Sequence, residues 1–121
     1  MIRKINFLFF VAILFFGLSC NSTAQKKVEE GNEIYVSEKT VIVDVRTPEE
    51  FVTGSIEGAI NIPLSELENR LQTLKSYDEI IVYCQAGGRS AKAASILIQN
   101  NFSNVIDGGG IADLKARLEN E

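Results

Sequence analysis

The sequence predicts an α/β fold, in which helices cover both faces of a central, mostly parallel sheet. Three short apolar runs rich in β-branched residues have the length of buried strands, at 41–45, 80–83 and 104–106. Stretches with apolar residues at helical spacing separate these runs. Strands that alternate with helices usually pair in parallel, because each helix returns the chain across the sheet. The 121 residues suffice for one such domain.

The first strand, at 41–45, ends in a charged turn that leads into a short helix. Thr47 is a suitable helix cap, and Pro48 suits the first helical position. The acidic residues Glu49 and Glu50 are interpreted as helix-capping charges. Gly54 is expected to end this helix.

The middle of the chain predicts a short strand and an amphipathic helix. Residues 59–62 are the strand candidate, and Pro63 stops it. A leucine stripe at helical spacing follows, made of Leu64, Leu67, Leu71 and Leu74. The stripe predicts one helix with a single face toward the core.

The strand at 80–83 runs directly into Cys84, and a glycine-rich turn then leads to a helix at 89–99. The expected apolar side of that helix carries Ala91, Ala94, Leu97 and Ile98. The third strand at 104–106 is followed by a predicted glycine turn at 108–110 and a final helix at 111–118.

The N-terminal segment predicts export. Arg3 and Lys4 precede an uncharged apolar run at 7–18, which is the layout of a secretory signal. A bilayer crossing takes about 20 apolar residues, so the run is short for a transmembrane anchor. We therefore expect a protein of the bacterial periplasm or cell envelope.

Two cleavage sites remain open. Residues 17–20 are similar to a bacterial lipobox, in which Cys20 would be lipidated and tether the protein to a membrane only through its lipid. The alternative is ordinary cleavage after Ala24. The expected organisation is a signal peptide at 1–19, a polar tether at 20–33 and a domain at 34–121.

Composition excludes several classes of function. Acidic residues outnumber basic ones, 16 to 12, and no basic stripe exists, so we expect no nucleic-acid partner. The chain contains no histidine, which argues against Cys–His hydrolases, histidine proton relays and most zinc or iron sites. We accordingly expect neither a metal nor another cofactor.

Cys84 is the candidate nucleophile. A buried strand delivers it to the carboxyl edge of the sheet, where open α/β folds bind ligands. Gly87 and Gly88 let the following backbone curl back, and Arg89 and Ser90 open a helix. This order favours a cradle of backbone N–H groups aimed at the sulfur, with a helix N-terminus behind them. Such a setting lowers the pKa of a thiol. The same donors would also hold a persulfide anion.

Here the sequence resembles the rhodanese family. The active-site turn of that family, C-x-x-G-x-R-S/T, is filled by Cys84, Gly87, Arg89 and Ser90. Three further segments are similar to family motifs, at 44–51, 54–63 and 106–109. Four motifs in the family's order, between residues 34 and 118, together make the resemblance specific, whereas one motif alone would be weak evidence for it.

The resemblance implies a three-layer α/β fold and a sulfurtransferase activity. Cys84 would take a sulfane sulfur from thiosulfate, a persulfide or a polysulfide, and pass it to a thiol or cyanide. The acceptor thiol would belong to a small molecule or a protein. The expected substrate- and persulfide-binding residues are Gln85, Ala86, Gly87, Gly88, Arg89 and Ser90, with Arg89 as the fixed positive charge.

Each of these assignments has a rival. Asp44 is interpreted as a support that fixes Arg46 or its loop rather than as a catalyst. Arg89 could instead satisfy a nearby carboxylate. Cysteine phosphatases use C-x5-R, but only four residues separate Cys84 from Arg89. The remaining alternative is a non-catalytic module that binds a partner or senses redox state through Cys84.

Overall fold

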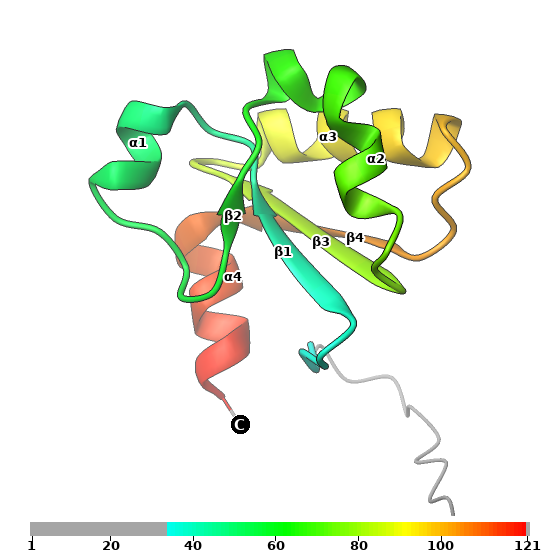
Figure 1. Cartoon of the computed structure of the whole chain (residues 1–121). Coiled ribbons are helices and arrows are strands. Elements are labelled where there is room, and N and C mark those ends of the chain that lie inside the picture. Colours follow the sequence, from blue (N-terminus) through cyan, green and yellow to red (C-terminus); the bar gives the residue numbers. More distant parts are fainter. Residues whose placement is uncertain (1–33, 121) are drawn as a thin grey trace, which may run out of the picture. The chain divides into compact units, whose positions relative to one another are not determined.

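The computed structural model describes residues 34–120, and these alternate strands with helices (Figure 1). In chain order the elements are β1 (Thr40–Asp44), α1 (Pro48–Val52), β2 (Ile60–Asn61), the 3₁₀ helix η1 (Leu64–Arg70), α2 (Leu71–Leu74), β3 (Glu79–Cys84), α3 (Gly88–Gln99), β4 (Val105–Gly110) and α4 (Ile111–Glu119). The predicted signal peptide, Cys20 and the tether lie outside the described residues. Within 34–120, no helix has the length and hydropathy needed to cross a bilayer.

The four strands form one sheet in the order β2-β1-β3-β4, and every pair of neighbours is parallel. In the pairing of β1 with β3, Thr40 lies opposite Glu79 and Asp44 lies opposite Tyr83. The carboxyl ends of the two central strands therefore meet at one edge of the sheet. The predicted parallel α/β fold is confirmed.

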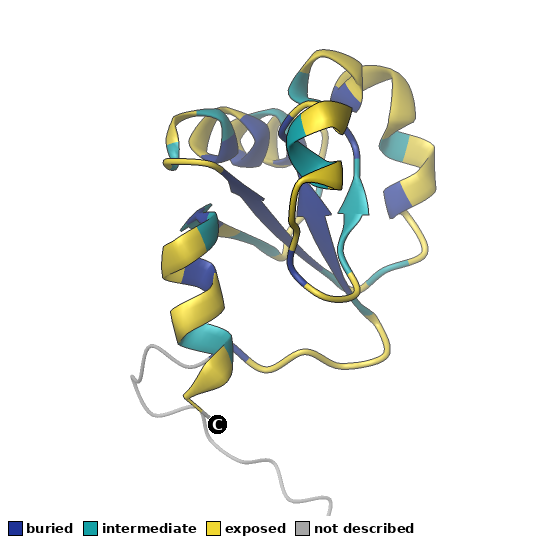
Figure 2. Cartoon of the chain, turned by 90° about the vertical axis from the view of Figure 1, so that its left-hand side faces the viewer, coloured by how far each residue is buried: buried dark blue, intermediate teal, exposed yellow. Residues whose placement is uncertain are grey.

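Side chains alternate between the two faces of the sheet, and each face has its own apolar cluster. Val43 and Val82 belong to the cluster that also contains Leu67 and Leu97, from η1 and α3. Ile42, Ile81 and Tyr83 belong to the other cluster, with Leu114 from α4. Figure 1 shows α2 and α3 on one side of the strands and α4 on the other, and Figure 2 shows the central strands as buried. Helices on both faces confirm the predicted three-layer architecture.

The short helix after β1 follows its sequence signals. Thr47 caps α1 by accepting a hydrogen bond from the backbone N–H of Glu50, whose carboxylate accepts one in return from the N–H of Thr47. This reciprocal pair is a capping box, and Pro48 stands at the first helical position as predicted.

The leucine stripe does not form one continuous α-helix. Leu64 and Leu67 lie on η1, whereas Leu71 and Leu74 lie on α2. Each pair is three residues apart, which is also the repeat of a 3₁₀ helix, so the spacing alone does not separate the two helix types. Leu67 and Leu74 are fully buried, and the other two leucines are partly buried and pack against the same apolar cluster.

Two further predictions were wrong in detail. The buried face of α3 carries Ser90, Ala93, Ala94 and Leu97, while Ala91 and Ile98 are exposed. The polar Ser90 belongs to the buried face, which shifts the core-facing side of the helix by about one position. The glycines at 108–110 continue β4 rather than forming a turn. They let the strand approach its neighbours closely, because a Cβ on Gly108 would lie 2.9 Å from the carbonyl oxygen of Val82.

Candidate active site

Cys84 is the last residue of β3 and lies at the carboxyl edge of the sheet. It is 1% exposed and is the free cysteine of the described residues. Its Sγ accepts a hydrogen bond of 3.0 Å from the backbone N–H of Gly87. The chain therefore turns back toward the sulfur within three residues, as the two glycines led us to expect.

The loop after Cys84 is held in this shape at Gly87, where α3 begins. Gly87 is the N-cap of α3. Its φ is +103°, a value that residues with a Cβ rarely adopt. Ser90 is fully buried and its hydroxyl donates a hydrogen bond of 2.9 Å to the carbonyl oxygen of Gly87. The first turn of α3 thus faces the sulfur.

These contacts favour the thiolate. Burial by itself raises the pKa of the Cys84 thiol. Hydrogen bonds from the N–H groups of Ser90, Gly87 and Ala86, and from the Ser90 hydroxyl when it turns from the Gly87 carbonyl oxygen to the sulfur, outweigh burial, so the pKa of Cys84 is lowered. The site generates this shift without histidine, through the backbone and one hydroxyl.

A second group of residues braces the loop that follows β1. The Asp44 carboxylate is buried and accepts hydrogen bonds from Nε and Nη2 of Arg46, at 3.0 and 2.7 Å. Arg46 also donates from Nη2 to the carbonyl oxygen of Gly54, at 2.7 Å, and from Nη1 to Oε1 of Gln85, at 3.0 Å. The Asn61 amide donates to the carbonyl oxygens of Asp44 and Arg46. Asp44 therefore fixes Arg46, and Arg46 reaches the loop of the candidate nucleophile.

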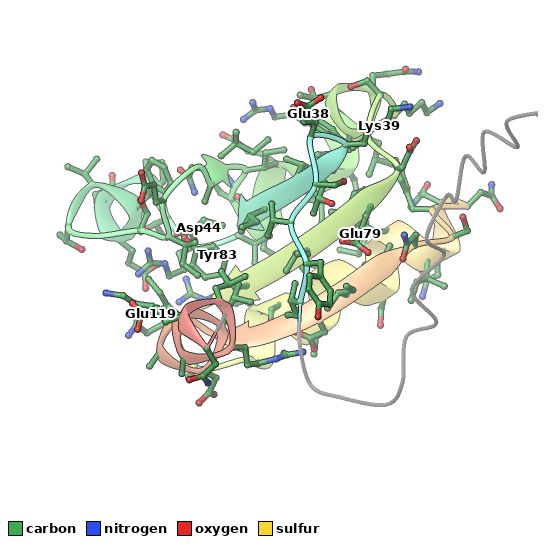
Figure 3. All side chains as sticks on the ribbon, turned by 90° about the horizontal axis from the view of Figure 1, so that it is seen from below. Glu38, Lys39, Asp44, Glu79, Tyr83 and Glu119 are labelled. Carbon is green, nitrogen blue, oxygen red and sulfur yellow. The ribbon has the colours of Figure 1, made fainter. Side chains whose placement is uncertain are left out.

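Tyr83 extends this group on the opposite face from Cys84. Figure 3 shows Asp44 and Tyr83 near each other at one end of the strands, with Glu79 at the other end. The Tyr83 hydroxyl accepts a hydrogen bond of 3.0 Å from the N–H of Ile56, and burial raises the pKa of Tyr83 to about 12. The phenol is thus a neutral bridge between β3 and the segment before β2.

Arg89 binds a carboxylate, which was the alternative interpretation of this residue from the sequence, and the partner is Glu50. Its Nη1 and Nη2 donate to the two carboxylate oxygens of Glu50, at 2.7 and 2.9 Å. The expected helix-capping role of Glu50 is also present, so one carboxylate serves both α1 and Arg89. Glu50 lies in the segment 44–51, which resembles a family motif and follows a strand that ends near the site. This placement is the sequence feature that could have identified Glu50 as the partner of Arg89.

Gly110, like Glu50, was not predicted from the sequence to belong to the site. It pairs with Cys84 in the sheet, and a Cβ on Gly110 would lie 2.9 Å from the carbonyl oxygen of Gln85. The last residue of β4 therefore limits the space available to the Cys84 loop.

The structure places the predicted site residues in two sets. Cys84, Ala86, Gly87 and Ser90 converge on the sulfur, whereas the side chains of Gln85 and Arg89 bind Arg46 and Glu50. Gly88 is the first residue of α3, and a Cβ added to it would meet no atom outside its own helix within 4 Å. Within 34–120 no group of three or more metal-ligating side chains is arranged to hold an ion.

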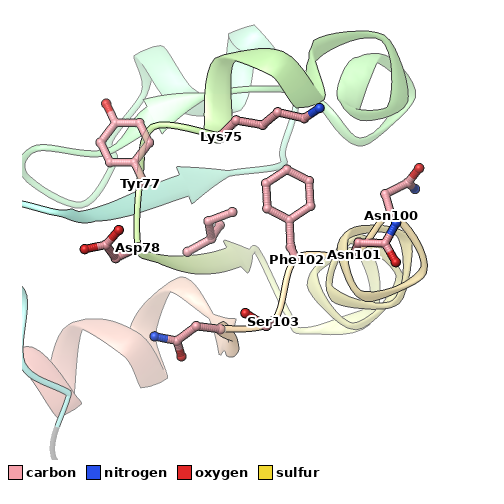
Figure 4. Close-up of a pocket in the computed structure, with 9 residues that line it drawn as sticks. Lys75, Tyr77, Asp78, Asn100, Asn101, Phe102 and Ser103 are labelled. Atoms are coloured by element: carbon pink, nitrogen blue, oxygen red, sulfur yellow. The ribbon is translucent and has the colours of Figure 1, made fainter.

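An open pocket of about 410 Å³ lies at the other end of the sheet (Figure 4). Its lining includes Lys75, Ile80 and Phe102. Ile80 stands near the amino end of β3, whereas Cys84 ends that strand. The pocket is therefore separate from the Cys84 site.

Comparison with known proteins assigns the chain to a family. Residues 23–116 match the model of the rhodanese-like domain. Thiosulfate sulfurtransferase PspE of Escherichia coli is 39% identical over 74 residues, which cover 60% of this chain and 71% of that protein. A sulfurtransferase of Allochromatium vinosum is 32% identical over 78 residues, covering 63% and 73%. The solved structure of an E. coli rhodanese with anions is 37% identical, with a TM-score of 0.57 and coverage of 61% and 89%. This chain therefore belongs to the family of rhodanese-like domains.

Proposed function

We propose that this protein is a sulfurtransferase that carries a sulfane sulfur as a persulfide on Cys84. The observation that carries the proposal is the environment of the Cys84 Sγ. It lies at the start of α3 and accepts hydrogen bonds from backbone N–H groups, which lower its pKa. The sulfurtransferases among the relatives support the same class of reaction.

In the first half-reaction the Cys84 thiolate attacks the outer sulfur of the donor. With thiosulfate, the S–S bond of the donor breaks and sulfite leaves with the bonding electron pair. With an organic persulfide, the leaving group is the corresponding thiolate. Cys84 then carries a persulfide, and no outside oxidant or reductant is consumed.

In the second half-reaction an acceptor thiolate or cyanide attacks the outer sulfur of that persulfide. The bond between the two sulfurs breaks, and the Cys84 thiolate is restored as the leaving group. The N–H groups of Ala86, Gly87 and Ser90 suit both states, because thiolate and persulfide are both anions. A low thiol pKa also makes Cys84 a good leaving group in this step.

The structure does not favour the phosphatase alternative. Only four residues separate Cys84 from Arg89, and the Arg89 guanidinium binds Glu50 through both terminal nitrogens. A phosphate group would need that guanidinium for its own oxygens. Hydrolysis of a generic aryl phosphate that disappears in Cys84→Ser would reverse this ranking.

Intact mass spectrometry tests the proposal directly. The protein is incubated in turn with thiosulfate, polysulfide and an organic persulfide. The expected product carries one added sulfur atom, which a reductant removes and which Cys84→Ala does not acquire. A thiol that gains no sulfur from any donor, but forms a mixed disulfide with an oxidised thiol, would instead support the binding or redox-sensing module.

For the N-terminal segment we propose export and lipidation at Cys20. The support is the sequence order of basic residues, a short apolar run and a cysteine. Labelling of cells with a radioactive fatty acid should mark the wild-type protein and not Cys20→Ala. A mature N-terminus at Gln25 without label would support ordinary cleavage after Ala24 instead.

A further inference from the structure

Two arginines lie beside the Cys84 loop, and each is paired with a carboxylate. Arg46 binds the buried Asp44, and Arg89 binds Glu50. These two cations and two anions sum to no net charge. The loop itself, residues 84–90, contains Arg89 as its one charged side chain. The side chains around the thiolate thus provide little uncompensated positive charge for an anionic substrate.

The Glu50–Arg89 pair is the accessible one of the two. Its side chains are 33% and 37% exposed, whereas those of Asp44 and Arg46 are 0% and 4% exposed. A substrate that approaches from solvent can therefore meet the Glu50–Arg89 pair, while Asp44 and Arg46 are enclosed by the protein. The charge that a donor encounters depends mainly on Glu50 and Arg89.

Glu50 is fixed in place independently of Arg89. Its carboxylate accepts hydrogen bonds from the N–H and the hydroxyl of Thr47, at 2.9 and 3.1 Å, as part of the capping box of α1. A carboxylate held by its own helix does not move aside freely when an anion approaches Arg89. An incoming anion must compete with Glu50 for the guanidinium.

We infer that Glu50 determines donor specificity, by neutralising Arg89 and so favouring organic persulfides over thiosulfate as the source of sulfur. The inference rests on the proposed sulfurtransferase function. Thiosulfate carries two negative charges and must approach a thiolate, so it benefits most from an unpaired cation. An organic persulfide brings at most one negative charge on its sulfur chain. Its transfer to Cys84 forms one S–S bond, breaks another and releases a thiolate, so the electrons balance.

The test compares Glu50→Gln with Glu49→Gln on two donors. Glutamine at position 50 can keep the capping box while it removes the charge. Glu49 is the exposed neighbour on the same helix, so Glu49→Gln makes the same charge change away from Arg89. The donors are thiosulfate and the persulfide of 2-mercaptoethanol, which has no other charged group. Rates are measured as kcat/KM with one common acceptor thiol.

We expect the wild-type protein to have the higher kcat/KM with the persulfide. Glu50→Gln should raise kcat/KM for thiosulfate by about fivefold or more, because it leaves the partly exposed charge of Arg89 without a carboxylate partner. The same variant should change kcat/KM for the persulfide by less than about twofold. Glu49→Gln should change both values by less than about twofold. The thiosulfate rate of Glu50→Gln should also fall more steeply with added salt than that of the wild type.

Arg89→Gln provides a second variant that does not depend on how Glu50→Gln folds. It leaves the Glu50 charge uncompensated, so it should lower kcat/KM for thiosulfate more than for the persulfide. The double variant, with Glu50→Gln and Arg89→Gln, should not show the increase in kcat/KM for thiosulfate that is expected of Glu50→Gln alone. Equal changes for the two donors in these variants would overturn the role of Glu50 but leave the sulfurtransferase standing. Absence of sulfur loading from both donors in every variant and the wild type would instead overturn the proposed function.

Discussion

Arg46 donates a hydrogen bond of 3.0 Å from Nη1 to Oε1 of Gln85, the residue that follows the candidate nucleophile. The same guanidinium binds the buried Asp44 and the carbonyl oxygen of Gly54. Arg46 thus connects the loop after β1, the loop before β2 and the Cys84 loop. It does not contact the sulfur, so we regard it as a positioning residue for the turn that holds Cys84.

Arg46→Lys should destabilise the protein although it keeps the positive charge. A lysine ammonium cannot reach the carboxylate, the amide and the carbonyl together, so the buried Asp44 carboxylate loses part of its hydrogen bonding and the contacts with Gly54 and Gln85 are lost. We expect a loss of about 2 kcal/mol in the free energy of unfolding, measured by urea denaturation. Arg70→Lys is the control, because Arg70 forms an exposed pair with Glu66. Similar losses for the two variants would contradict the bracing role of Arg46.

Gly87→Ala and Gly88→Ala should have opposite effects on stability. Gly87 has a φ of +103°, where a side chain costs about 1–2 kcal/mol. Gly88 is the first residue of α3, and a Cβ there would meet no atom outside its own helix within 4 Å. Alanine is up to about 1 kcal/mol more favourable than glycine in a helix. Urea denaturation measures both values. Destabilisation by Gly88→Ala equal to that of Gly87→Ala would show that the loop needs flexibility rather than a particular backbone conformation.

The lowered pKa of Cys84 predicts a reactive thiol below the usual pH range of cysteine. The rate of alkylation by iodoacetamide follows the thiolate, so its midpoint with pH should lie below that of an unperturbed cysteine. Ser90→Ala removes a hydroxyl that can turn from the Gly87 carbonyl oxygen to the thiolate and stabilise it, so this change should move the midpoint upward. Ser103→Ala, which changes an exposed serine at the pocket far from Cys84, is the control. An unchanged midpoint in Ser90→Ala would assign the shift to backbone N–H groups alone.

Gly110→Ala should disturb the Cys84 loop from the neighbouring strand. The added Cβ would lie 2.9 Å from the carbonyl oxygen of Gln85, so one of the two backbones must shift. We expect a loss of about 1–3 kcal/mol in the free energy of unfolding and slower sulfur loading of Cys84. Loading is followed by intact mass spectrometry. Wild-type loading in a destabilised Gly110→Ala protein would show that the close contact supports the fold and not the site.

The sequence predicted those features of the fold that depend on residues close together in the chain. The strand before Cys84 and the parallel pairing of the sheet follow from the apolar runs and their spacing, and the Thr47 cap follows from the residue types around Pro48. The Glu50–Arg89 pair did not follow, because its members are 39 residues apart and helix capping already accounted for Glu50. The glycines of β4 have no side chains, so they do not contribute to the apolar pattern by which a strand is predicted. Their role depends on how closely two backbones approach, which only the tertiary structure shows.

The Glu50–Arg89 pair also predicts how stability depends on pH. Hydrogen bonds from Arg89 and from the N–H of Thr47 lower the pKa of Glu50 from 4.5 to about 2. A carboxyl group with a lowered pKa in the folded state stabilises the protein fully above its unfolded pKa, and this contribution is lost as the pH falls through the folded value. The melting temperature of the wild type should therefore exceed that of Glu50→Gln at pH 7. The difference should shrink below about pH 4.5 and disappear as the pH falls through about 2.

Thermal unfolding followed by circular dichroism over this pH range measures the difference, with Glu49→Gln as the charge-matched control. Added salt should reduce the difference at pH 7, because both side chains of the pair are partly exposed. A difference that does not change between pH 7 and pH 2 would mean that it comes from hydrogen bonds of Glu50 that glutamine fails to reproduce, and not from the charge of the carboxylate. Arg89 would then be available to anions in spite of its partner, and the inferred preference for persulfides would lose its physical basis.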